Sequence, residues 1–270
     1  MTDMERLRAW SDENLLASFE LLVRHPPTCV PIASRRFGTV TAFAAGRRSG
    51  FFNAVAVLAP ASARDVEAAV DWVRDLGQSV SLRVREDVDD EAVRRAAENL
   101  GLERSPWVDP AMVMAPLAIA PALPAGLRID IATPATQDRW YAALAAGAGV
   151  APMHPFLRDL LPEDAIDDPD IRLFGGFLDE APVATSVAIR SANSVGIYAV
   201  GTAEFARRRG IGTAMTWAAV DAGREWRSSA VVLQASEMGE PVYRAMGFRI
   251  VTGYVSYDEP IPTRAASEAG

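Results

Sequence analysis

The stretch Arg207-Arg208-Arg209-Gly210-Ile211-Gly212 stands at a junction between two kinds of sequence. Residues 194–202 before it are apolar and rich in β-branched and aromatic side chains, which predicts a strand, and residues 213–220 after it resemble a helix. Glycines at the start of a helix let backbone amides approach an anion, and arginines add positive charge. The stretch has the features of a pyrophosphate-binding site. Nucleic-acid binding and a solvated turn are the alternative interpretations.

Composition narrows the choice of ligands and cofactors. The chain has 270 residues, half of them hydrophobic, and a net charge of -8, which argues against nucleic acid as a partner. All 27 residues counted as Lys+Arg are arginine. A Walker A phosphate loop and a pyridoxal phosphate enzyme both require a lysine, so these two classes are excluded.

Few residues are available for metal or disulfide chemistry. The chain has one cysteine, Cys29, and two histidines, His25 and His154. No intrachain disulfide can form, and no cluster has the spacing of metal ligands, so no metal is expected. The N-terminus lacks the apolar core of a signal peptide, and no apolar run approaches the roughly 20 residues of a membrane span. We expect a cytoplasmic protein with no membrane partner.

Alternating elements are predicted in the C-terminal half. Strands are expected at 127–131, 171–178, 182–190, 195–201, 230–234 and 250–257, and helices at 134–146, 210–224 and 241–246. The N-terminal half repeats the last part of this order, with strands at 51–58 and 80–84 and helices at 63–76 and 91–100. Gly101 and Gly247 each end a helix at an apolar-Gly-apolar step, which indicates a weak internal repeat. Two unrelated α/β halves are the alternative.

The expected domain organisation follows from this pattern. Residues 116–126 hold three prolines and form the linker candidate, and residues 261–270 form a tail. The domains are then 1–115 and 127–260, both of mixed α/β (α+β) class.

Two motifs resemble the GNAT N-acetyltransferase superfamily. The stretch VGTAEFARRRGIGTA at 200–214 resembles its acyl-CoA loop, and VLQAS at 232–236 with VYRAMGF at 242–248 resembles the next strand and helix. The two motifs occur in the order and at the spacing that are typical of that superfamily. The resemblance covers about residues 127–258, and the first half matches only in outline.

The resemblance implies a fold and a set of site residues. The fold would be a mixed sheet, flanked by helices, that splays between its fourth and fifth strands to hold acetyl-CoA. The backbone of Val200 and Thr202 would pair with the pantetheine arm, and Tyr243 would be a general acid for the CoA thiolate. The pyrophosphate would be held by Arg207, Arg208, Arg209, Gly210, Gly212 and Thr213. Ser236 stands where many members have asparagine, and it completes the expected cofactor-binding set.

The expected activity is direct transfer of an acyl group, acetyl above all, from CoA to a small-molecule or peptide amine. A non-catalytic acyl-CoA sensor is the alternative. Glu237 and His154 are candidates for the base by location only. An acidic segment could attract a cationic amine or could be a solvated loop; its residues are Asp159, Glu163, Asp164, Asp167, Asp168 and Asp170.

The first half is expected to lack a CoA site. If Gly101 is aligned with Gly247, Arg64 and Val66 correspond to Gly210 and Gly212. Shifting by one residue brings Asp65 and Glu67 there instead, and carboxylates would repel a pyrophosphate. We therefore predict one CoA per chain and a covering role for the first half.

Overall fold

The computed structural model describes residues 2–26, 31–47, 49–151, 157, 161 and 163–260. Within these ranges the strands form one sheet of eleven, in the order β1-β2-β3-β4-β11-β5-β10-β9-β8-β7-β6. The strands are β1 (Ala33–Phe37), β2 (Val40–Ala44), β3 (Ala54–Val57), β4 (Ser81–Arg85), β5 (Glu103–Met114), β6 (Leu127–Ile131), β7 (Ile171–Leu178), β8 (Ala181–Arg190), β9 (Ser194–Thr202), β10 (Ala230–Gln234) and β11 (Arg249–Asp258). The helices are α1 (Asp3–Arg24), α2 (Ala63–Asp75), α3 (Glu91–Asn99), α4 (Gln137–Ala148), α6 (Ile211–Glu225) and α7 (Glu240–Ala245). Short 3-10 helices are η1 (Gly50–Phe52), η2 (Glu86–Val88), η3 (Glu163–Asp167) and η4 (Glu204–Ala206).

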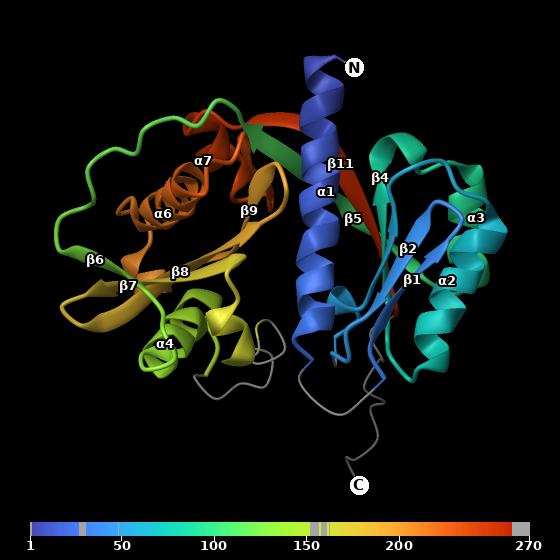
Figure 1. Ribbon diagram of the computed structural model, residues 1–270, viewed down its shortest axis with the longest axis horizontal. Coiled ribbons are helices and arrows are strands. Elements are labelled where there is room, and N and C mark those ends of the chain that lie inside the picture. Colours follow the sequence, from blue (N-terminus) through green and yellow to red (C-terminus); the bar gives the residue numbers. More distant parts are fainter. Residues whose placement is uncertain are drawn as a thin grey trace, which may run out of the picture.

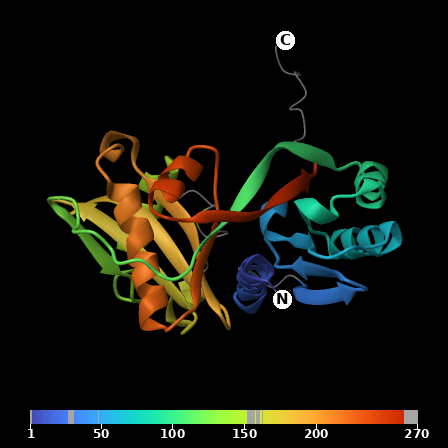
Figure 2. The ribbon, with the colours of Figure 1, turned by 90° about the horizontal axis from the view of Figure 1, so that it is seen from above.

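The two halves exchange their last strands at the centre of the sheet. β11, from the end of the chain, lies between β4 and β5, and β5, from the first half, lies between β11 and β10. β5 and β11 run antiparallel, with partners from Arg249 and Val113 to Asp258 and Glu103. Figure 2 shows both long strands crossing from one half to the other. Each half therefore completes the sheet of the other, and the division of the chain in sequence is not a division of the sheet.

The internal repeat is visible in the order of elements. The series β3-α2-β4-α3-β5 matches β9-α6-β10-α7-β11, and each series contains one parallel strand pair, β3 with β4 and β9 with β10. The mixed sheet with flanking helices confirms the predicted fold class. The sequence analysis does not predict α1, β1, β2 or the long strand β5.

Two predicted boundaries are wrong for local reasons. Residues 50–52 form η1 instead of the start of a strand, because the Ser49 hydroxyl accepts a hydrogen bond from the Phe51 amide and Gly50 packs against the backbone of Val80. The helix expected from residue 134 begins at Gln137. The preceding residues form a turn in which the Thr133 amide donates to the Thr136 hydroxyl at 2.9 Å.

α1 covers the seam between the halves on one face of the sheet (Figure 1). Its apolar residues share a core cluster with β2, β3, β5, β10 and β11. Asn14 approaches Gly196 so closely that a Cβ there would lie 1.8 Å from the Asn14 Oδ1, and the Tyr198 hydroxyl donates to that oxygen at 2.8 Å. A glycine at 196 is thus required for α1 to seat on β9.

α6 packs on the opposite face of the C-terminal half. Val195 and Ile197 of β9 share a core cluster with α6, whereas the next residue, Tyr198, packs with the cluster that contains α4. This alternation places α6 on one face and α4 on the other. Among the described residues, no helix is long and apolar enough to cross a membrane.

Candidate functional site

β9 and β10 separate soon after they begin. Their parallel pairing runs over three residue pairs and ends at Gly196 and Val232, although β9 continues to Thr202 and β10 to Gln234. Parallel strands that stop pairing leave backbone groups of their facing edges free for another partner. The predicted divergence of the fourth and fifth strands of this half is therefore present.

β9 contains a bulge in the part of the strand that no longer pairs with β10. The register with β8 shifts between Thr185 and Val187, and Ala199 lies in the left-handed region with φ 49°. Gly147 of α4 contacts the backbone of Gly201 just beyond the bulge, and a Cβ on either glycine would lie 2.9 Å from the other residue's carbonyl carbon. This contact holds the end of β9 against α4, a constraint that the sequence analysis missed.

The junction Arg207–Gly212 forms the N-terminus of α6. Gly210 is the N-cap, with φ 75°, and no side chain caps the helix there. Thr2, Ser62 and Asp90 cap α1, α2 and α3 with their side-chain oxygens, whereas α4 and α7, like α6, have no side-chain cap. The first amides of α6 are thus left for a ligand, and the helix dipole favours an anion at that position.

One cleft of about 470 Å³ brings most of the predicted site residues together. Its lining includes Val200, Thr202, Arg207, Arg208, Gly210, Gly212, Thr213, Ser236 and Tyr243. Arg209 is exposed and is not part of this lining. Arg207 is held in place because its Nε donates to the Thr202 carbonyl at 3.1 Å. We call this space the CoA cleft, and its ligand remains a prediction.

Tyr243 reaches the CoA cleft from α7. Its ring meets Phe248 edge-on, with centroids 5.9 Å apart. Burial raises the pKa of Tyr243 above its ordinary value, and a hydrogen bond with the Thr216 side chain offsets part of this rise. The phenol is therefore protonated at neutral pH and able to donate.

Two neighbours position Tyr243 and Ser236. Gly239 packs under the tyrosine ring, where a Cβ would lie 2.9 Å from Tyr243 Cε2. The Ser236 hydroxyl accepts a hydrogen bond from the Gly239 amide at 3.2 Å. Ser236 thus lines the cleft and also fixes the turn before α7, while Gly239 is a site residue that sequence reasoning missed.

The residues suggested for the base and for cation attraction occupy other places. Glu237 is exposed and lies outside the lining of the CoA cleft. His154, Asp159 and the side chain of Glu163 lie outside the part of the chain that the structure describes.

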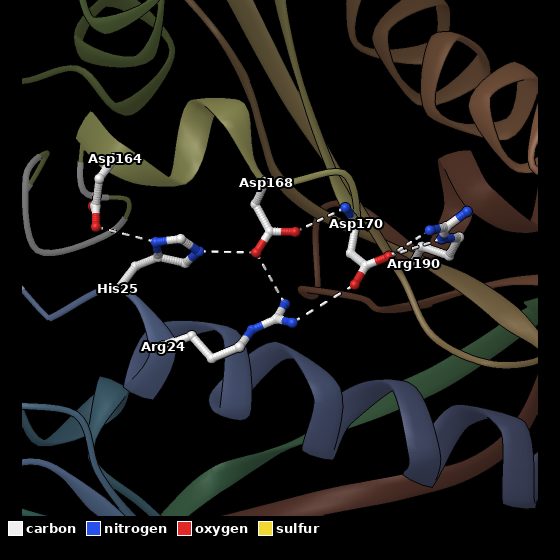
Figure 3. Close-up of polar contacts among 6 residues, drawn as sticks. All are labelled: Arg24, His25, Asp164, Asp168, Asp170 and Arg190. Carbon is white, nitrogen blue, oxygen red and sulfur yellow. Dashed lines mark hydrogen bonds and ion pairs between the residues drawn. The ribbon is translucent and has the colours of Figure 1, made fainter.

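The C-terminal part of the acidic segment is tied into a polar cluster (Figure 3). His25 lies between Asp164, at 3.2 Å, and Asp168, at 2.9 Å. Arg24 also pairs with Asp168, at 3.1 Å, and Arg190 donates to Asp170 at 2.7 Å. The Asp168 side chain is only 8% exposed, whereas that of Asp164 is 63% exposed. The cluster fastens the end of α1 to the C-terminal half.

The matching elements of the first half have a different geometry. β3 and β4 stay paired along all four residues of β3, from Ala54 to Val57. At the start of α2, the Ser62 hydroxyl accepts from the Asp65 amide and donates to the Asp65 carboxylate. The strand pair is closed and the helix start is capped and acidic, unlike β9, β10 and the start of α6. That this half binds no CoA stays a prediction.

Comparisons with known proteins agree with this geometry. Residues 122–229 match the family model described as "Acetyltransferase (GNAT) domain". A solved GCN5-related N-acetyltransferase from Kribbella flavida is 19% identical, with a TM-score of 0.67, over 92% of this chain and 96% of that one. A tandem GNAT protein from the clavulanic acid biosynthesis pathway is 14% identical, with a TM-score of 0.59, over 96% of this chain and 97% of that one. At these identities the likeness shows the fold, and no curated protein matches.

Proposed function

We propose that the protein is an acyl-CoA-dependent N-acyltransferase that transfers an acetyl group directly to an amine. The match of residues 122–229 to the model described as "Acetyltransferase (GNAT) domain" supports this proposal. The observation that carries this proposal is the divergence of β9 and β10 beside an uncapped helix N-terminus. One strand edge and one helix start then face the same cleft. This combination fits a ligand with an amide-bearing arm and a pyrophosphate.

The CoA cleft offers a separate contact for each part of such a ligand. Backbone groups of Val200 and Thr202 would bond the amides of the pantetheine arm. The amides of the first turn of α6 would receive the pyrophosphate, with Arg207 and Arg208 adding charge. Met238 and Val242 line the cleft while their side chains are 81% and 42% exposed, which leaves apolar surface for a bound ligand to cover.

The chemistry requires a proton for the departing thiolate. As the amine nitrogen bonds to the thioester carbon and the C–S bond breaks, negative charge develops on sulfur. Tyr243 would donate its proton to that sulfur, and its raised pKa keeps the proton in place until then. General acid catalysis of this kind contributes about 10²–10⁴-fold in rate.

A screen of an amine library with acetyl-CoA, read as release of free thiol, tests the proposed activity. Acceptor-dependent thiol release by the wild-type protein is expected. In Tyr243→Phe, turnover should fall by about 10²–10⁴-fold while calorimetric CoA affinity is unchanged, because the variant loses a proton donor and little surface. CoA binding with no acceptor-dependent thiol release from any library member would favour a non-catalytic acyl-CoA sensor. An unchanged turnover number in Tyr243→Phe, with chemistry rate-limiting, would make Tyr243 a core residue.

A further inference from the structure

A second cavity lies at the seam between the two halves, on the α1 face of the sheet. It has a volume of about 340 Å³, and both halves contribute to its lining. Tyr198 and Ala199 of β9 and Gln234 of β10 border it, whereas Val200 and Ser236, a few atoms further along the same segments, border the CoA cleft. The lining of this second cavity, called the seam cavity, therefore adjoins the lining of the CoA cleft along β9 and just after β10.

The walls of the seam cavity are mostly apolar. Leu15, Phe19 and Leu22 of α1 face it from one side, and Phe51 and Phe52 of η1 close it toward the first half. Its volume is at the low end of the roughly 300–1,000 Å³ of ligand pockets. Such a space suits a compact, largely apolar molecule and disfavours a polyamine or an amino sugar, whose polar groups would lose their hydration without partners.

Polar groups of the seam cavity are concentrated on its floor, in a row across the sheet. Gln234 pairs with Ala111 on β5, and Asp109 lies two residues along on the same face of that strand. Arg83 of β4 extends toward this position, with its Nη1 3.7 Å from the Asp109 Oδ2. Asp109 therefore stands between the divergence of β9 and β10 and the guanidinium of Arg83.

Gln234, Arg83 and Asp109 each have surroundings that favour a contact with a bound ligand. The Gln234 Nε2 is buried and has no hydrogen-bond partner among the described residues. Arg83 is fixed by a hydrogen bond to the Ser256 hydroxyl and by the Phe51 ring, whose centroid is 4.5 Å from its guanidinium carbon. Burial raises the pKa of Asp109, and the nearby Arg83 charge offsets part of that rise. Asp109 is thus a partly desolvated carboxylate, which makes it a stronger proton acceptor than an exposed one.

Building on the proposed function, we propose that the seam cavity is the acceptor site, that it takes a compact primary amine with an apolar body, and that Asp109 binds the amine and accepts its proton. The neutral amine nitrogen attacks the thioester carbonyl, the N–C bond forms and the C–S bond breaks. One proton passes from nitrogen to the Asp109 carboxylate, and Tyr243 gives one to sulfur. The proton on Asp109 then returns through solvent to the Tyr243 phenolate. The first half would in this way supply the base, and Gln234 would donate a hydrogen bond within the site.

Phenethylamine is the probe for the test, with spermidine and glucosamine as polar comparisons. Calorimetry in the presence of saturating CoA should show phenethylamine binding to the wild-type protein and not the two polar amines. Asp109→Asn removes the charge at constant size, and Leu15→Trp fills the cavity from α1. Matched controls are Asp71→Asn, an exposed carboxylate on α2, and Leu123→Trp, an exposed leucine before β6.

We expect Asp109→Asn to lower kcat with phenethylamine and acetyl-CoA by about 10²–10⁴-fold. Leu15→Trp should raise KM for phenethylamine at least tenfold, and both variants should keep wild-type CoA affinity and far-ultraviolet circular dichroism. The controls should match the wild-type protein. Phenethylamine binding and turnover that survive both cavity variants would overturn the inference, as would a preference for spermidine or glucosamine. Thiol release with such a polar amine would leave the proposed function standing, because only the acceptor assignment would have failed.

Discussion

Replacing Gly212 by valine should weaken CoA binding while leaving the fold intact. Gly212 lies in the first turn of α6, and its φ is not in the left-handed region. A Cβ there would lie 3.3 Å from the Thr202 hydroxyl, so alanine is tight but tolerable, and the two methyl groups of valine must extend into the CoA cleft. Valine is no worse than glycine in a helix, so no large loss of stability is expected.

The size of the effect follows from the contacts that valine would block. A hydrogen bond to a charged group is worth about 1.5–3 kcal/mol, and about 1.4 kcal/mol corresponds to a tenfold change in affinity. Loss of one amide-to-pyrophosphate contact therefore predicts CoA affinity about ten- to a hundredfold weaker. Gly212→Ala should fall between valine and the wild-type protein.

Isothermal titration calorimetry with CoA measures this effect. Ala218→Val is the matched control, because it places the same side chain on the same helix but faces the groove beneath the linker. The control should bind CoA as the wild-type protein does. If Gly212→Val is folded by circular dichroism and binds CoA with unaltered affinity, the pyrophosphate does not sit at the start of α6.

Two other predictions concern Tyr243 and the cluster at the end of α1. Gly239→Ala should displace the Tyr243 ring, because a Cβ at residue 239 would lie 2.9 Å from Tyr243 Cε2. The variant should lower kcat at least tenfold with little change in CoA affinity. A wild-type kcat would show that the ring position is unimportant. Burial alone would raise the pKa of Asp168, but its contacts with His25 and Arg24 outweigh this effect and lower the pKa. These contacts should therefore stabilise the folded state at pH values above the ordinary aspartate pKa of about 3.9. The stabilisation should be lost as the pH falls below that value. Asp168→Asn should therefore reduce the free energy of unfolding by about 1–3 kcal/mol at pH 7 and by less at pH 3, as urea unfolding would show. An equal loss at both pH values would contradict this.

Local sequence patterns are sufficient for several strands of the C-terminal half and for the start of α6. The strands 127–131, 171–178 and 230–234 are predicted with the observed bounds, since the first alternates apolar and charged residues and the other two are mostly apolar stretches. The Arg-Gly junction marked the start of α6 because its glycines and arginines have a local chemical meaning. Tyr243 was found from its spacing to Gly247 within a resemblance to a family, and periodicity alone would have left it in the core.

Long-range pairing could not be predicted from the same patterns. β5 begins with Glu103, Arg104 and Ser105 and contains Pro110, a composition that gives little strand signal. It is a strand because β10 and β11 flank it, and those partners are more than 100 residues away. The seam cavity was missed for the same reason, since Arg83, Asp109 and Gln234 lie far apart in the sequence and meet only after the strand exchange.

A crystal structure of the protein with acetyl-CoA tests the central claim most directly. We predict one acetyl-CoA per chain, with its pyrophosphate on the amides of Ile211–Thr213. Its thioester should lie where β9 and β10 diverge, within hydrogen-bond reach of the Tyr243 hydroxyl and with its carbonyl carbon facing the seam cavity. Acetyl-CoA bound along α2, or a thioester remote from Tyr243, would contradict the account.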